Sequence, residues 1–151
     1  MTSPCLGRVK DVLDDWKDKG HISELVADGI IILFRDKLYG SGRFTNVIEI
    51  LGPDIKITVR LFAGLQGDDR ALRDAYAYLL NLPAMDASVT IQRDIKSGNV
   101  GASVTFPCAS NRHQIESNFS MAMNKMTTYL ETRYDKICTD LLELGVTFKN
   151  G

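Results

Sequence analysis

The stretch DASVTIQRDIKSGNVGASVTF, residues 86–106, decides the fold, because apolar and polar residues alternate on both sides of a single turn. A period of two is typical of a β-strand that buries one face. Ser97-Gly98-Asn99 supplies the turn residues, and Pro107 ends the second strand because proline cannot donate to a β-ladder. The pattern therefore predicts an antiparallel hairpin. Its apolar face consists of Ala87, Val89, Ile91, Val100, Ala102, Val104 and Phe106.

The opposite face of this hairpin is small and polar. It has no acid, base or nucleophile with an orienting partner, so we predict that it meets solvent or a second subunit. Gly101 favours the second subunit, because a glycine inside a strand weakens the sheet unless something approaches closely. The face consists of Ser88, Thr90, Gln92, Gly101, Ser103 and Thr105.

Three further strands are predicted upstream of the hairpin. The segments are Gly29–Phe34, Phe44–Leu51 and Ile55–Leu61, and the last alternates apolar with polar residues. Gly52-Pro53-Asp54 is a turn signature between the second and the third. Short connections between such strands indicate an antiparallel meander.

Helices are predicted at both ends of the chain and in its middle. The first starts at Ser3-Pro4, carries an apolar stripe and ends at Gly20. The second covers Ala71–Leu82 and stops before Pro83. The third covers about Asn111–Leu144, roughly 50 Å at about 1.5 Å per residue, with a break or overhang expected near Arg133-Tyr134. Val146-Thr147-Phe148 is expected to form a short tail.

These elements give the order α-β-β-β-α-β-β-α. We predict an α+β fold in which helices cover one face of a five-stranded, mainly antiparallel sheet. We predict a single domain over residues 1–151, because the sequence shows no linker, repeat or low-complexity segment. The hydrophobic fraction of 44% and the charged fraction of 25% are ordinary for a globular domain.

The charge and the cysteine pattern restrict the class of protein. A net charge of −1 predicts no nucleic-acid partner, and no apolar run approaches the roughly 18 residues of a membrane helix. The N-terminal residues show no signal-peptide pattern, so we expect a cytoplasmic location. Cys5, Cys108 and Cys138 are odd in number and form no CxxC motif, which predicts free thiols.

Catalytic and metal sites find little support in the sequence. His21 and His113 share no ligand spacing with each other or with a cysteine, so we predict no metal and no cofactor. Cys108 and His113 lie five residues apart and supply an alternative hypothesis, a small thiol-dependent enzyme, although no third group orients the histidine.

Two candidate contact surfaces remain. Tyr76 and Tyr78 cannot both face the core from one helix, and tyrosine is enriched at interfaces, although an ordinary core edge explains them equally well. The predicted self-association set is Tyr76, Tyr78, Ser88, Thr90, Gly101 and Ser103. The predicted partner-binding set follows the apolar strand, where core packing is the alternative, and consists of Ile30, Ile32, Phe34 and Phe44.

The order of elements resembles the type III secretion chaperone-like fold, a group that includes the CesT/Tir chaperones and the YbjN-type sensory transduction regulators. The resemblance covers roughly Val9 to Leu144. It is carried by IKITVRLFAGL (residues 55–65), ALRDAYAYLLNL (71–82), and the hairpin from residue 87, which runs into IESNFSMAMNKMTTYLETRYDKI (115–137).

The resemblance implies a small, non-enzymatic and usually dimeric protein, and we expect it to be bacterial. Secretion chaperones bind an extended segment of an effector over apolar patches. They are commonly acidic, whereas this chain carries a net charge of −1, so a regulator-like role stays open. We therefore expect a homodimeric protein- or peptide-binding module. The alternatives are the thiol-dependent enzyme and a small-molecule sensor with a pocket between sheet and helices.

Overall fold

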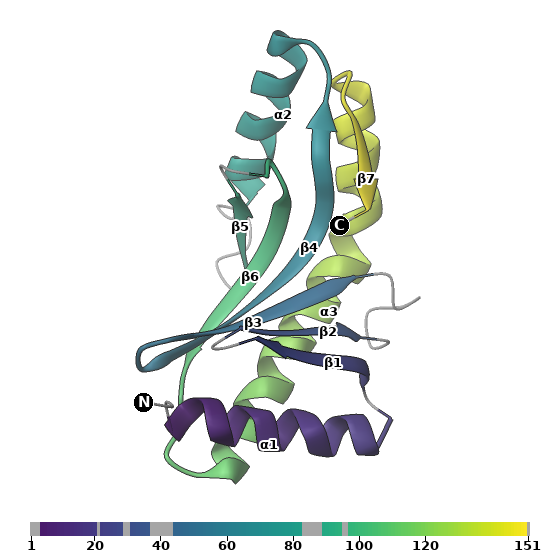
Figure 1. The fold of residues 1–151 in the computed structure, drawn as a ribbon. Helices are drawn as coiled ribbons and strands as arrows, with labels where there is room; N and C mark the ends of the chain where they lie inside the picture. Colours follow the sequence, from purple (N-terminus) through teal and green to yellow (C-terminus); the bar gives the residue numbers. More distant parts are fainter. Residues whose placement is uncertain are drawn as a thin grey trace.

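The computed structural model describes residues 4–20, 22–28, 31–36, 44–82, 89–94 and 97–150. Within this part of the chain it shows an α+β fold with three helices and a seven-stranded antiparallel sheet, which confirms the predicted class (Figure 1). The elements are α1 (Pro4–Asp18), β1 (Ile22–Asp28), β2 (Ile31–Asp36), β3 (Thr45–Leu51), β4 (Asp54–Gln66), α2 (Asp69–Asn81), β5 (Thr90–Arg93), β6 (Val100–Pro107), α3 (Arg112–Glu143) and β7 (Thr147–Asn150).

The sheet is organised around β4. Its strand order is β1-β2-β3-β4-β6-β5, so β2, β3 and β4 form the predicted three-stranded meander and β6 lies between β4 and β5. β3 pairs with β4 only from Asp54 to Val59, whereas β4 continues to Gln66. β7 pairs with this upper part of β4. The predicted short tail is therefore a strand, because the long β4 offers it an edge with unpaired backbone groups.

The sheet also gains β1 at the other end. This strand precedes the first strand predicted from the sequence, and it pairs with β2. These two additions account for the difference between the five predicted strands and the seven observed.

One face of the sheet carries the core. Along β4, Ile55, Ile57 and Val59 are buried, whereas the alternate residues Lys56 and Arg60 are not. α3 runs along this buried face and passes behind the strands in Figure 1. The apolar stripe of α3 packs against this face, and nearly every turn of the helix contributes a buried side chain. These side chains are Ile115, Phe119, Ala122, Met123, Met126, Tyr129, Leu130, Ile137 and Leu141.

The last helix has no break at Arg133-Tyr134 and is one helix of 32 residues. Tyr134 packs its ring against Phe44 at 5.0 Å and against Phe62 at 5.6 Å, between ring centroids. The position that interrupts the apolar spacing is thus an aromatic contact with the sheet. The helix extends further than a small sheet requires because β4 and β7 lengthen the surface that it covers.

The prediction of three free thiols is wrong for two of them. Cys5, in the first turn of α1, is bonded to Cys108, which follows β6, across 103 residues of sequence. The same two segments are joined by a hydrogen bond of 3.2 Å from Arg8 Nη1 to the carbonyl oxygen of Ala109. Sequence spacing contains no sign of this pairing, because only the tertiary fold brings α1 next to the loop before α3.

Reduction of the Cys5–Cys108 disulfide is expected to lower the free energy of unfolding by about 2–4 kcal/mol, because the bond restricts a long loop of the unfolded chain. Urea unfolding followed by circular dichroism, with and without dithiothreitol, measures the difference. The Cys5→Ser variant is the control, since it should be less stable than the wild type and should not respond to the reductant. Three reactive thiols per unreduced, denatured chain, instead of one, would show that the bond does not form.

Candidate functional site

The face of the sheet that the helices leave open is the candidate site. Its side chains stand in rows, because residues in register on antiparallel strands point to the same side. The rows consist of Glu49–Lys56–Thr105, Val47–Thr58–Ser103–Thr90 and Arg60–Gly101–Gln92. The small polar residues of the opening hairpin that the structure describes thus all lie on this face.

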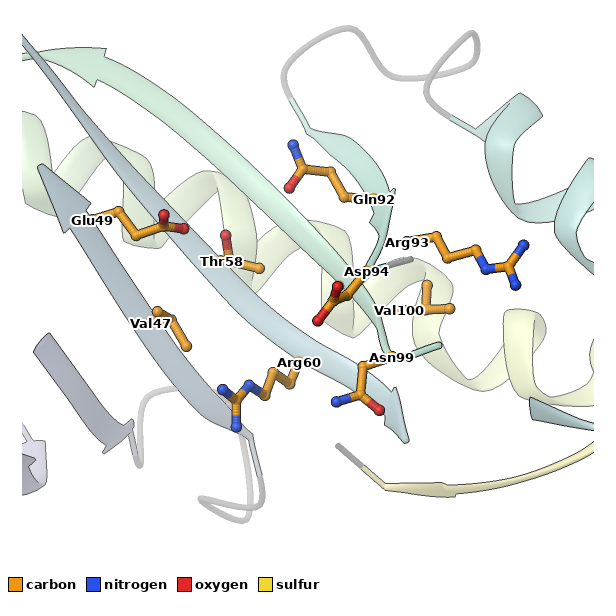
Figure 2. A pocket seen from close by; sticks show the side chains of 10 residues that line it. Val47, Glu49, Thr58, Arg60, Gln92, Arg93, Asp94, Asn99 and Val100 are labelled. Atoms are coloured by element: carbon orange, nitrogen blue, oxygen red, sulfur yellow. The ribbon is translucent and has the colours of Figure 1, made fainter. Parts of the chain in front are cut away.

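A hollow of about 260 Å³ opens in this face, and strands β3, β4, β5 and β6 all contribute to its lining. Figure 2 shows Glu49 toward one end of the hollow, Arg60 toward the other, and Val47 and Thr58 between them. Pockets for small molecules usually measure roughly 300–1,000 Å³. The hollow is therefore better suited to one inserted side chain than to a cofactor.

Gly101 lines the hollow, and its neighbours leave no room for a side chain at this position. A Cβ atom at this position would lie 2.8 Å from Thr58 Cγ2 and 3.0 Å from the carbonyl oxygen of Val59. The close approach that the glycine predicted is thus made within the chain, and it no longer argues for a second subunit at that point. Ser103, in the next row, is only 3% exposed, and its hydroxyl donates to the carbonyl oxygen of Thr90 at 3.4 Å.

Several polar groups around the hollow are available to a partner. Within the described part of the chain, Arg60, Gln92 and Asn99 make no side-chain hydrogen bond or ion pair. Asp94 is held by the hydroxyl of Ser97, which donates to its Oδ2 at 2.8 Å. Arg93 points away from the hollow in Figure 2, and its guanidinium lies 3.9 Å above the ring centre of Tyr76.

The predicted self-association residues do not form one surface. Thr90, Gly101 and Ser103 lie on the open face, whereas Ser88 is outside the described residues. Tyr76 and Tyr78 belong to α2, on the helical side, and both make internal contacts. The Tyr78 hydroxyl donates to Asp140 Oδ2 of α3 at 2.5 Å, and Lys136 Nζ donates to the same oxygen at 2.9 Å.

The predicted partner-binding residues lie along β2 and at the start of β3. Ile30 is outside the described residues, and the backbone register places Ile32 opposite Ile48 and Phe34 opposite Asn46. Phe44 is only 6% exposed, since it packs against Tyr134. Phe44 is therefore closed into the core in this conformation.

The alternative hypotheses meet specific obstacles. Cys108 is bonded to Cys5, so it offers no thiol for nucleophilic attack in this form, and His113 is exposed at the start of α3. Two hollows that border α3 have volumes of about 110 and 70 Å³, below the size of a metabolite pocket. No helix in the described ranges has the length and hydropathy to cross a membrane, and no three metal-ligating side chains cluster among those residues.

Sequence reasoning did not identify Glu49, Arg60 and Asn99 as parts of one site. Glu49 and Arg60 lie on the polar side of the alternation along β3 and β4, which the sequence shows only as a solvated face, and Asn99 lies in the turn before β6. The register between strands is what brings them together.

Comparisons with known proteins support the fold. No protein-family model matches the chain, and no curated protein matches it. A chain of the HopA1–SchA chaperone–effector complex is similar in structure, with a TM-score of 0.53, 14% identity, and coverage of 85% of this chain and 96% of that chain. YbjN from E. coli, described as a putative transcription regulator, gives a TM-score of 0.53, 10% identity, and coverage of 91% and 95%. The chain therefore has the chaperone-like fold predicted from its sequence.

The Gly101→Ala substitution is expected to lower the free energy of unfolding by about 1–3 kcal/mol, because the added methyl group overlaps Thr58 and the Val59 carbonyl. Urea unfolding measures the loss. The same substitution in a Thr58→Ser background should cost less, because the serine lacks Cγ2 while the carbonyl stays.

The control for this experiment is Gly7→Ala in α1, where a Cβ atom would meet nothing within 4 Å. Alanine should stabilise that helix by roughly 0.5–1 kcal/mol. If Gly101→Ala behaved like Gly7→Ala, the close contact with Thr58 would be refuted.

The Tyr78–Asp140 hydrogen bond is expected to make the free energy of unfolding decrease as the pH rises in the alkaline range. Burial, and then the hydrogen bond donated to Asp140, raise the pKa of Tyr78 above its ordinary value. The neutral phenol therefore stabilises the fold fully below the unfolded tyrosine pKa of about 10, and this contribution is lost as pH rises through the folded value.

The measurement is the difference in unfolding free energy between the wild type and Tyr78→Phe from pH 8 to pH 11. The wild type should be the more stable protein at pH 8, and the difference should shrink above about pH 10. The contributions of the other tyrosines to the pH dependence cancel in this difference, because both proteins contain them. A difference that stays constant over this range would contradict the assignment.

Proposed function

We propose that this chain is a non-enzymatic protein- or peptide-binding module that acts as a homodimer. The observation that carries the proposal is the open face of β3, β4, β6 and β5, which no described helix covers and which is hollowed beside Gly101. The likeness in fold to a chain of a chaperone–effector complex supports it.

The chemistry of the open face favours recognition of another polypeptide. It offers amide groups, hydroxyls and the ends of long charged side chains, spread over several strands. Such groups recognise a surface by hydrogen bonds and charge, and arginine is enriched at protein interfaces. The hollow has room for a side chain of a partner.

A second contact region belongs to the same proposal. The apolar residues Ile30, Ile32 and Phe34 stay the predicted contact for the partner. Exposure of Phe44 at that site requires its ring to leave Tyr134.

The oligomeric state tests the proposal directly. Size-exclusion chromatography with light scattering, over roughly 1–300 μM chain, is expected to give about twice the chain mass of 16.8 kDa. A mass that stays at 16.8 kDa throughout would refute the homodimer.

A further inference from the structure

Two opposite charges stand apart on the open face of the sheet. Glu49 on β3 and Arg60 on β4 both line the hollow, and neither forms an ion pair with any described residue. Figure 2 shows the two side chains toward different ends of the hollow, with Val47 and Thr58 between them.

The register explains why these charges do not meet within one chain. Glu49 lies beside Lys56, and Val47 lies beside Thr58. Arg60 is on the far side of the Val47–Thr58 row, so its backbone is separated from that of Glu49 by roughly 13 Å along the strand direction. Along the line from Glu49 to Arg60 the side chains are therefore negative, neutral and positive, and the positive Lys56 lies beside this line, next to Glu49.

Such a pattern is complementary to itself. A two-fold axis that runs along the Val47–Thr58 row places the Glu49 end of one copy over the Arg60 end of the other. This arrangement is possible because a symmetric interface uses the same patch on both copies. We propose that a second copy of this chain covers the open face, with Glu49 of each copy paired to Arg60 of the other. The inference rests on the proposed homodimer and specifies the surface that forms it.

The same two-fold axis also places Val47 and Lys56 opposite residues of the second copy with which they can make favourable contacts. Val47 faces its own equivalent, and Lys56 of one copy comes over the hollow beside Gly101 of the other. The carboxylate of Asp94 and the amide oxygens of Gln92 and Asn99 border that hollow, and these groups accept hydrogen bonds from an ammonium group.

Ideal strand spacings then set the strands of the two sheets at roughly 40° to each other. This is close to the angle of about 30° at which stacked sheets usually pack.

The two α2 tyrosines of the predicted self-association set do not support a contact through the helical side, because both make contacts within the chain. Tyr76 lies beneath Arg93, and Tyr78 is bonded to Asp140. The open face, by contrast, carries Glu49 and Arg60, which form no ion pair with any residue that the structure describes.

Charge reversal tests the pairing. Sedimentation velocity over a range of concentrations gives the dimer dissociation constant of the wild type, Glu49→Lys, Arg60→Glu and the double variant. Each single variant should weaken the dimer at least about tenfold, because each substitution turns two attractive pairs into two repulsive ones. The double variant restores opposite charges and should return to within about threefold of the wild type.

Matched controls carry the same charge changes away from the open face. Asp11→Lys on α1 and Arg73→Glu on α2 alter exposed residues and should leave the dimer unchanged. Thermal unfolding of each variant at low concentration checks that the folded chain is retained.

The outcomes separate this inference from the proposed function. A wild-type monomer would refute the homodimer and the inference together. A dimer that survives both single reversals would show that another surface mediates dimerisation, so the inference fails and the homodimer stands. Single variants that dissociate and a double variant that does not recover would show that Glu49 and Arg60 are not partners.

Discussion

The structure depends on the alternation of side chains along β4. This strand pairs with β3, β6 and β7, so its pleat sets the two faces of the whole sheet. Ile55, Ile57 and Val59 point to the helices, and the polar residues between them point away. A slip of one residue in register would exchange the faces and expose the core, so burial of the apolar side enforces the register. The open face is therefore a consequence of how the core is buried.

The two sides of the sheet consequently have different roles. On the helical side, polar side chains are used to hold elements together, as Tyr78 does between α2 and α3, and the Cys5–Cys108 bond ties α1 to the loop before α3. On the open side, Glu49 and Arg60 remain without ion-pair partners within the described residues. Charges that a folded chain leaves unpaired on one exposed face are available for a second polypeptide, which is why binding is assigned to that face.

Much of the fold was predictable because it follows from local periodicity. The hairpin of residues 90–107, the meander and all three helices have strong patterns of period two or 3.6, and their positions were predicted closely. β7 was expected to be a tail, because a strand of four residues has too short a pattern to be recognised. The disulfide was missed because it joins residues 103 apart, and Gly101 was assigned to a second subunit because its true neighbour, Thr58, lies on another strand.

The sequence by itself determined which residues are apolar, roughly where the three helices and five of the strands lie, and that one side of β4, β5 and β6 is mainly polar. Those properties depend on neighbours along the chain. Only the tertiary structure decided that Glu49, Thr58 and Arg60 share a face with Gly101, that the hollow forms there, and that Cys5 meets Cys108. The physical reason is that such contacts depend on strand register and helix docking. Both result from burial of the whole core, and no short segment contains that information.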